Sequence, residues 1–361
     1  MPIRETSFRI GCGRYQQEAG ILSALGEEVR RFGAAPLVVG GKTALSITRE
    51  TIEKSLASAC ENYEIIEHRG TCNEPRAKEL AALAAEKGYD VIVGVGGGVL
   101  MDFAKLIADL AGLPIINVPT SSATCAAFTP LSVCYTPEGE TVGTRHFTKE
   151  VDAVLADTAI LAQQPTRLLL AGVFDAMAKF LEIKQRFNEE EDYPLGLDWA
   201  YVLSKRSFED LSKKTAIAIR DIEAGNLTPA VEQILFCTIA ATGVISGIAR
   251  GSNQCALAHK FYEGTRAMYL QESRPYLHGE IVGVGLLLQN FFNGEPENNE
   301  FLLSVMKQYQ MPASVSAVGL TPTEEMRQKY YEKLKAGSAI DETNPEELKK
   351  LDAGLTYLWR L

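Results

Sequence analysis

The sequence has few of the features that mark secreted or nucleic-acid-binding proteins. Its seven cysteines are an odd number and include no Cys-x-x-Cys pair, which argues against a disulfide framework and against a cysteine-rich zinc site. Basic residues are scarcer than acidic ones, 36 against 46 in a chain of 361 residues, so the formal net charge is −10. Because nucleic acids and anionic membranes attract basic surfaces, we expect neither as a partner.

Long apolar runs are also missing. No stretch approaches the roughly 18 uninterrupted apolar residues of a membrane span, and the N-terminal residues lack the apolar core of a signal peptide. Apolar residues nevertheless make up 46% of the chain and charged residues 23%, which is the balance of a globular enzyme. We therefore expect a cytoplasmic protein with reduced thiols and a small-molecule substrate.

Up to about residue 160, short apolar runs alternate with helical patterns. The apolar runs predict strands at 35–40, 63–66, 90–95 and 114–119, and the helical patterns lie at 47–59, 74–87 and 100–111. Strands that are apolar throughout are buried on both faces, and their alternation with helices is typical of a parallel sheet covered on both sides. The first part of the chain is therefore predicted to be an α/β domain.

After about residue 160 the strand signal fades and apolar residues recur at helical spacing. Helices are predicted at 165–185, 197–223, 229–246, 281–292, 323–335 and 344–351. Asn344 and Pro345 suit the cap and the first position of the last of these helices. We predict an α/β domain over residues 1–160, an all-helical domain over 161–361 and a cleft between them.

A glycine-rich turn is the sharpest local signal. Gly96, Gly97 and Gly98 lie between a predicted strand and a predicted helix, where glycines let the backbone approach a pyrophosphate and the helix N-terminus attracts its charge. The turn departs from G-x-G-x-x-G because the sixth position is Val99. Two interpretations stay open at this point, a nucleotide site and a tight turn that requires small residues.

Two further segments bear on a nucleotide. The hydroxyl-rich run 120–125 follows a strand and could line a polyphosphate or ribose, or could simply cap a helix. After the first predicted strand, Gly41 and Lys42 stand where folds that prefer NAD often place a carboxylate for the ribose 2′-hydroxyl. Nothing there repels a 2′-phosphate, so we predict that NADP(H) is accepted at least as readily as NAD(H).

A candidate metal site lies in the helical half. His259 and His278, two of only four histidines, lie 19 residues apart, and Asp175 interrupts a strongly apolar helical run. Each has an ordinary alternative: the histidines could be satisfied core residues, and Asp175 could pair with Lys179 one turn away. Together the three would supply the ligands of a catalytic zinc or ferrous site with an open position.

These residues resemble one family, the iron-containing alcohol dehydrogenase superfamily, in its glycerol-dehydrogenase-like branch. The resemblance covers nearly the whole chain and depends on the order and spacing of several motifs. These motifs are Gly96-Gly97-Gly98-x-x-x-Asp102-x-Ala104-Lys105, Val118-Pro119-Thr120, Leu131-Ser132-Val133-x-Tyr135, Leu170-Ala171-Gly172-x-x-Asp175, Ala258-His259 and His278-Gly279-Glu280.

The resemblance implies a Rossmann-like N-terminal domain and a helical C-terminal domain, the fold shared with dehydroquinate synthase. It implies one divalent metal on Asp175, His259 and His278, with zinc favoured over iron, and assembly into a homo-oligomer. It also implies a nicotinamide cofactor, NAD(H) or NADP(H). The predicted cofactor-binding residues are Gly96, Gly97, Gly98, Val99, Asp102, Thr120, Thr129, Leu131 and Tyr135.

The chain departs from typical glycerol dehydrogenases at the expected substrate position. The aspartate that contacts the polyol in those enzymes is replaced by Cys125, the predicted substrate residue. The segments 69–74 and 123–133 resemble a narrower group, the hydroxycarboxylate dehydrogenases, which reduce 2-oxo acids. A carboxylate would repel an anionic substrate, whereas a polyol would use its acceptors, so we predict a small 2-oxo acid and its 2-hydroxy acid as the substrate pair.

Three alternatives remain. The first is a dehydrogenase for glycerol or another small polyol or alcohol. The second is a lyase on the same scaffold, which would want basic residues near the metal, where the sequence around His259 offers only Lys260, Arg266 and Arg274. The third is a nucleotide-binding homologue without activity, because Tyr262 replaces a histidine and Phe174 a small residue of the family.

Overall fold

The computed structural model describes residues 9–187, 195–249 and 255–361, which form two compact units. The sheet unit comprises Ile10–Gln164 and Lys214–Val244, and the helical unit comprises Arg9 with the described parts of Pro165–Lys213 and Ile245–Leu361. We predicted a boundary at residue 160, with everything after it in one domain. The structure instead groups residues 214–244 with the sheet unit, where Gln17 donates to the backbone oxygen of Glu232 at 2.8 Å.

A six-stranded sheet forms the centre of the sheet unit, with strand order β1-β8-β5-β4-β2-β3 and every neighbouring pair parallel. The strands are β1 (Arg14–Glu18), β2 (Pro36–Gly41), β3 (Glu64–His68), β4 (Val91–Gly96), β5 (Ile115–Pro119) and β8 (Ala153–Asp157). The central strands β4 and β5 are buried along their whole length. The parallel α/β prediction is therefore confirmed.

Helices cover both faces of this sheet. They are α1 (Leu25–Val29), α2 (Lys42–Ala59), α3 (Glu74–Lys87), α4 (Gly98–Ala111) and α5 (Thr158–Leu161). Leu25, Ile52 and Leu56 of α1 and α2 share a buried cluster with Val38 and Val93 of the sheet. On the opposite face α4 lies so close that a Cβ at Gly94 would be 2.5 Å from the Cβ of Ala104. Because β4 ends at Gly96 and α4 begins at Gly98, the N-terminus of α4 lies next to the carboxyl end of β4.

Other elements of the chain were predicted incompletely. The edge strand β1 and its neighbour β8 were not predicted, nor was the antiparallel hairpin of β6 (Leu131–Tyr135) and β7 (Thr141–His146). The helix predicted at 229–246 is divided into α8 (Pro229–Phe236), one π-helical turn over Cys237–Ala241 and α9 (Thr242–Ile248). Threonine hydroxyls in this stretch compete with backbone N–H groups for the backbone oxygens. Thr242 Oγ1, for example, donates to the backbone oxygen of Cys237 at 2.7 Å.

The stretch Pro229–Ile248 is also long and apolar enough to cross a membrane, with a mean hydropathy of 1.6. Of its apolar window, 61% is buried inside the protein, and a core helix passes the same test of length and composition. The stretch is therefore weak evidence for a membrane span. All seven cysteines are free thiols in the structure.

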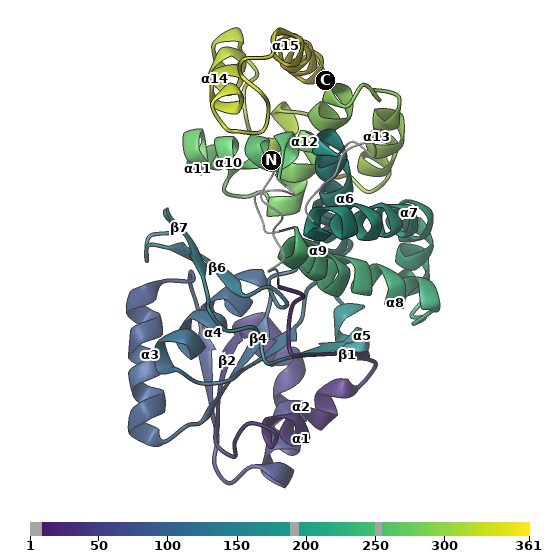
Figure 1. Ribbon diagram of the computed structural model, residues 1–361. Helices are drawn as coiled ribbons and strands as arrows, with labels where there is room; N and C mark the ends of the chain where they lie inside the picture. Colours follow the sequence, from purple (N-terminus) through teal and green to yellow (C-terminus); the bar gives the residue numbers. More distant parts are fainter. Residues whose placement is uncertain (1–8, 188–194, 250–254) are drawn as a thin grey trace. The chain divides into compact units, whose positions relative to one another are not determined.

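The described residues of the helical unit contain helices and no strand. Besides the end of α9, its α-helices are α6 (Thr166–Arg186), the first part of α7 (Leu195–Glu223), α10 (Leu257–Met268), α11 (Leu270–Ser273), α12 (His278–Phe292), α13 (Asn298–Gln308), α14 (Glu324–Lys335) and α15 (Pro345–Trp359). Asn344 caps α15 by accepting from the backbone nitrogen of Glu346 at 3.0 Å, and Pro345 is the first helical residue, as predicted. The buried helix α12 packs against α6, α10 and α15 (Figure 1).

Candidate active site

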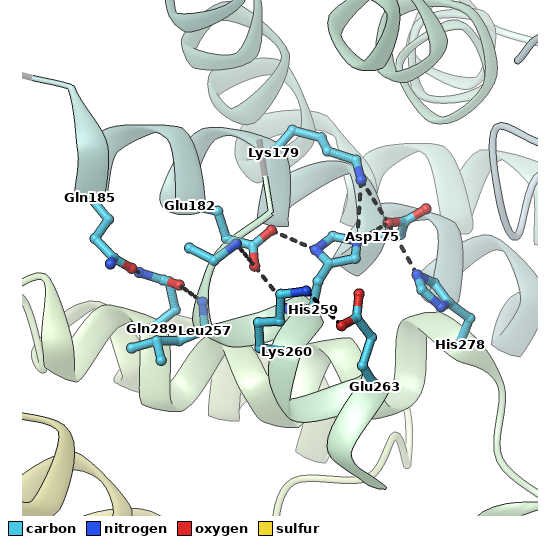
Figure 2. A network of polar contacts seen from close by, with 11 residues as sticks. Asp175, Lys179, Glu182, Gln185, Leu257, His259, Lys260, Glu263, His278 and Gln289 are labelled. Carbon is cyan, nitrogen blue, oxygen red and sulfur yellow. Dashed lines mark hydrogen bonds and ion pairs between the residues drawn. The ribbon is translucent and has the colours of Figure 1, made fainter. Parts of the chain in front are cut away.

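The three predicted metal ligands come together in the helical unit from three helices. Asp175 lies in the middle of α6, His259 in the first turn of α10 and His278 at the first position of α12. Asp175 Oδ1 is 3.2 Å from His259 Nε2 and 3.5 Å from His278 Nε2, and one ligand atom of each residue lies within 4.8 Å of the others. Figure 2 shows both imidazoles directed at the carboxylate.

Close helix packing brings these ligands together. A Cβ at Gly279 would lie 1.8 Å from the backbone oxygen of Ala171 on α6, and one at Gly285 would lie 2.7 Å from the oxygen of Ala258 on α10. Only glycine permits such an approach, so the backbone of α12 packs directly against the backbones of both neighbours. The motif glycine after His278 is therefore explained by packing.

An ion pair fixes the start of α12 as well. Arg167 of α6 donates from Nε and Nη2 to the two carboxylate oxygens of Glu280, each at 2.6 Å, and Glu280 in turn accepts from the backbone nitrogen of Leu277 at 2.8 Å. The helix was predicted to begin at residue 281 and begins at His278, because Glu280 satisfies a backbone donor at its N-terminus. His278 is thus held on a rigid helix end.

Glu182 is a part of the site that sequence analysis missed. It lies two turns after Asp175 on α6, is 0% exposed, and accepts from His259 Nδ1 at 2.5 Å. Its other oxygen accepts from the backbone nitrogens of Ala256 and His259, each at 2.8 Å. A carboxylate on Nδ1 leaves Nε2 of His259 as the free ligand atom, which is the arrangement that orients metal-bound histidines.

The charges of these groups reinforce one another. Burial opposes ionisation of Asp175, but the Lys179 ammonium and the two imidazoles outweigh it and hold the pKa of this carboxyl well below its usual range. Burial also opposes an imidazolium at His259, yet the Glu182 carboxylate raises the pKa of His259 to about 10. At His278 burial dominates and lowers the pKa.

The donor set suits a divalent cation. One carboxylate oxygen and two imidazole nitrogens are three ligands of the type and number found at catalytic zinc sites, which keep a fourth position open. The alternative of ordinary core histidines does not account for their convergence on a buried carboxylate. The alternative ion pair is present too, since Lys179 Nζ lies 3.4 Å from Asp175 Oδ1.

Two residues at which the chain differs from the family it resembles lie close to these predicted ligands. The ring of Tyr262 packs edge-on to His278 with centroids 4.2 Å apart, so it supports the ring of that imidazole. Phe174 is 1% exposed and packs against α12, where a Cβ on Gly283 would be 3.1 Å from its ring. Both residues are accommodated without separating the three ligands.

The predicted cofactor residues gather in the sheet unit at the carboxyl end of β4. Gly97 precedes α4 and provides no side-chain cap, and the side chain of Val99 is 48% exposed. A Cβ on Gly97 would meet only Ser121, at 3.8 Å, whereas one on Gly98 would lie 2.8 Å from Thr124 Oγ1. The backbone at the start of α4 is therefore open to an anion at Gly97.

The remaining predicted cofactor residues surround this turn. Thr120 donates its backbone nitrogen to the oxygen of Gly96 at 2.9 Å, and Lys105 of α4 donates to the oxygens of Thr129, at 2.9 Å, and Leu131. The backbone nitrogen of Tyr135 donates to the oxygen of Cys72 at 2.8 Å. Lys105 was not among the predicted cofactor-binding residues, yet its hydrogen bonds shape the loop that carries Thr129 and Leu131.

Asp102 is 7% exposed and lies among protein groups. Its Oδ2 accepts from the backbone nitrogen of Val133 at 3.1 Å, and its Oδ1 lies 3.0 Å from Lys105 Nζ. Burial raises its pKa, with the Lys105 ammonium opposing that effect. These contacts support the hairpin next to the glycine turn, and a direct contact of Asp102 with the cofactor stays a prediction.

The residues singled out for specificity also lie in the sheet unit. Cys125 is partly buried, and its backbone oxygen accepts from the nitrogen of Phe128 at 2.9 Å. Gly41 ends β2 and Lys42 begins the exposed start of α2. A Cβ at Gly41 would meet nothing within 4 Å, so the space beside it is open.

Comparison with known proteins identifies the family. The family model described as iron-containing alcohol dehydrogenase matches residues 12–161. The chain is 34% identical to a glycerol dehydrogenase of Thermotoga maritima over 85% of this chain and 84% of that protein. It is 32% identical to hydroxycarboxylate dehydrogenase A of Escherichia coli K12 over 69% of this chain and 68% of that protein.

The fold comparison agrees with these matches. The structure of a probable glycerol dehydrogenase from Sinorhizobium meliloti superposes with a TM-score of 0.80 at 24% identity, over 99% of this chain and 98% of that one. This likeness establishes the α/β-plus-helical fold. With the sequence matches, it shows that the chain belongs to the iron-containing alcohol dehydrogenase family.

Proposed function

We propose that this dehydrogenase interconverts a small 2-oxo acid and its 2-hydroxy acid. The observation that carries the proposal is Cys125, which stands where a polyol-binding carboxylate is expected in glycerol dehydrogenases. A thiol at this position does not repel an anionic substrate, whereas a carboxylate would. The similarity to hydroxycarboxylate dehydrogenase A supports the same substrate class.

The family and its relatives imply NAD(H) and a metal ion. We propose that Asp175, His259 and His278 hold the metal, with zinc as the favoured ion. A bound divalent metal would act as a Lewis acid on the substrate oxygen. Glu182 keeps His259 in the required tautomer, and the ion pair of Arg167 with Glu280 holds the helix end that carries His278.

The glycine turn and the loop that Lys105 organises are the proposed cofactor site. The open backbone at Gly97, at the N-terminus of α4, supports a phosphate position there, and Thr120, Thr129, Leu131 and Tyr135 are the proposed neighbours of the cofactor. Hydride transfer itself needs only that the nicotinamide and the substrate carbon meet in a fixed geometry.

The cofactor preference is a finer proposal. Gly41 offers no carboxylate to a ribose 2′-hydroxyl, and Lys42 adds a positive charge, so NADP(H) is expected to serve at least as well as NAD(H). Turnover measured with NAD(H) and with NADP(H) gives the cofactor preference of the wild type. Gly41→Asp is expected to shift this preference toward NAD(H). A strong wild-type preference for NAD(H) would contradict it.

A panel of 2-oxo acids, aldehydes and polyols, followed by nicotinamide absorbance in both directions, tests the substrate class. We expect the highest kcat/KM with a small 2-oxo acid. The second candidate is a glycerol or other polyol dehydrogenase, favoured by the similarity to the Thermotoga maritima enzyme. Faster oxidation of glycerol than of any 2-hydroxy acid would reverse our order.

Assembly is a separate proposal. The chain is expected to form a homo-oligomer, as the family resemblance implies. Size-exclusion chromatography with light scattering measures the mass in solution, and a value equal to one chain of 39.4 kDa would contradict this.

A further inference from the structure

The two proposed histidine ligands are supported unequally. Figure 2 shows polar contacts on both sides of the His259 ring, with Asp175 and Glu182, whereas the His278 ring contacts Asp175 alone. In the described part of the chain Nδ1 of His278 has no hydrogen-bond partner, and its side chain is 29% exposed against 9% for His259. Because a metal-binding imidazole is normally oriented through its second nitrogen, the ring of His278 depends on another contact.

A fixed backbone at His278 does not by itself fix the ring. The ion pair of Arg167 with Glu280 holds the helix end, but the imidazole still rotates about its own torsions, of which the second is broad. Rotation would turn Nε2 away from Asp175 Oδ1, now 3.5 Å away. The ring of Tyr262 opposes this rotation, since it packs edge-on to the imidazole at an interplanar angle of 70°.

Tyr262 is itself held by Arg266, one turn later on α10. The guanidinium carbon is 5.5 Å from the centroid of the Tyr262 ring, within the range of a cation–π contact. The same guanidinium donates from Nη1 to the backbone oxygen of Ser273 and from Nη2 to that of Tyr276, each at 2.5 Å. These two oxygens lie in the segment that leads into α12. One arginine therefore fixes both the packing ring and the chain just before His278.

The residues of α10 that reach the site are spaced for this task. His259, Tyr262 and Arg266 follow one another at three and four positions, so they share one face of the helix. We propose that Tyr262, held by Arg266, is a positioning residue whose ring keeps Nε2 of His278 directed at the metal position. This inference deepens the proposed metal site and depends on it. It gives a role to a residue at which the chain differs from the family pattern.

Zinc affinity of Tyr262 variants, measured by competition with a chelator, tests the role of the ring. Tyr262→Leu removes the ring, and we expect about 10-fold weaker zinc binding, the effect of losing one aromatic contact or one partner of a metal-bound histidine. Tyr262→Phe keeps the ring and should retain the wild-type affinity. Arg266→Met should weaken zinc binding as well, because it releases both the ring and the segment before α12.

Two control variants separate positioning from a general loss of stability. Tyr357→Leu removes a partly buried ring that stacks on Phe291 at the other end of α12, with centroids 5.3 Å apart. Arg327→Met removes an arginine of α14 that donates to Asp352 of α15 at 2.6 Å. Both controls should lower the melting temperature and leave zinc affinity unchanged. If they weaken zinc binding as much as the Tyr262 and Arg266 variants do, the proposal is wrong.

Cobalt(II) in place of zinc gives a readout that stability does not change. The visible absorption of cobalt(II) depends on the arrangement of its ligands, so at saturation it reports the position of His278 and not the affinity. The spectrum of Tyr262→Leu should differ from that of the wild type, and the spectrum of Tyr262→Phe should match it. Identical spectra for wild type and Tyr262→Leu would overturn the proposal, as would a Tyr262→Phe variant that behaves like Tyr262→Leu.

Failure of the proposed metal site would give a different result. Wild-type protein that binds neither zinc nor cobalt refutes the metal assignment itself. Wild-type protein that binds one metal ion per chain, with Tyr262→Leu unchanged in affinity or in spectrum, refutes only the positioning role. Neither measurement requires turnover, so the outcome does not depend on which substrate the enzyme uses.

Discussion

The two units build their candidate sites in opposite ways. In the sheet unit the proposed cofactor residues lie within residues 96–135, close to one turn and one loop, and the proposed phosphate position depends on backbone groups. In the helical unit the proposed metal ligands come from three separate helices and would act through their side chains. The difference teaches that an added negative charge should damage the first site, whereas a removed side chain should damage the second.

The largest expected effect comes from removing a ligand in the helical unit. His278→Ala should reduce turnover at least about 10³-fold, because a Lewis-acid metal contributes several kcal/mol to such a reaction. Fluorescence titration with reduced nicotinamide should show cofactor binding unchanged, since the glycine turn belongs to the other unit. His146→Ala, at an exposed residue of β7, is the control. Normal turnover in the ligand variant would refute the metal assignment.

Added volume at the helix contact should also be costly. Gly279→Ala places a Cβ 1.8 Å from the backbone oxygen of Ala171, so α12 must move away from α6. We expect the free energy of unfolding to fall by about 3 kcal/mol, at the upper end for overpacking, together with weaker metal binding. Gly41→Ala is the control, since a Cβ there meets nothing within 4 Å. Thermal unfolding of Gly279→Ala and Gly41→Ala compares their stabilities. Equal melting temperatures for the two variants would contradict the packing account.

The support of His259 is expected to matter less than the ligands themselves. Glu182→Gln keeps the shape of the side chain but replaces the carboxylate that holds His259 Nδ1. Metal affinity should fall about 10- to 100-fold, as for other partners of metal-bound histidines. Competition with a chelator measures it, and Glu263→Gln, an exposed carboxylate on α10 paired with Lys260, is the control. Unchanged affinity would show that Glu182 only fills space.

The smallest effect is expected at the glycine turn. A side chain on Gly97 meets little, so Gly97→Glu should fold normally while bringing a negative charge to the proposed phosphate position. Cofactor affinity should be about tenfold weaker than in Gly97→Gln, which has the same size without the charge. Zinc content should be equal in both. Equal cofactor affinities would place the phosphates elsewhere.

The contrast between a site built from one local turn and a site built from three separate helices also explains which features could be predicted from the sequence. Strands β2 to β5 and the turn after β4 follow from local apolar runs and glycines, so they were predicted. The edge strand β1 is polar and β8 is a five-residue apolar run that resembles a buried helix turn, so neither was distinguished. Local patterns predict local structure and the sites that local structure builds.

The helical site required information that no local pattern contains. Asp175, His259 and His278 were brought together by a family resemblance, because spacing alone left core histidines and an ion pair open. Glu182 was missed, although Asp175, Lys179 and Glu182 recur one turn apart on one face of an apolar helix. Three charges on a buried helix face are a signal of a polar site, and this pattern could have found Glu182 as well as Lys179, which was considered only as an ion-pair partner of Asp175.

Anomalous X-ray diffraction at the zinc edge, from crystals grown with zinc, tests the central claim most directly. The predicted result is a peak about 2.0–2.2 Å from Asp175 Oδ1, His259 Nε2 and His278 Nε2. A zinc peak remote from these three side chains, or no peak from zinc-saturated protein, would contradict the account.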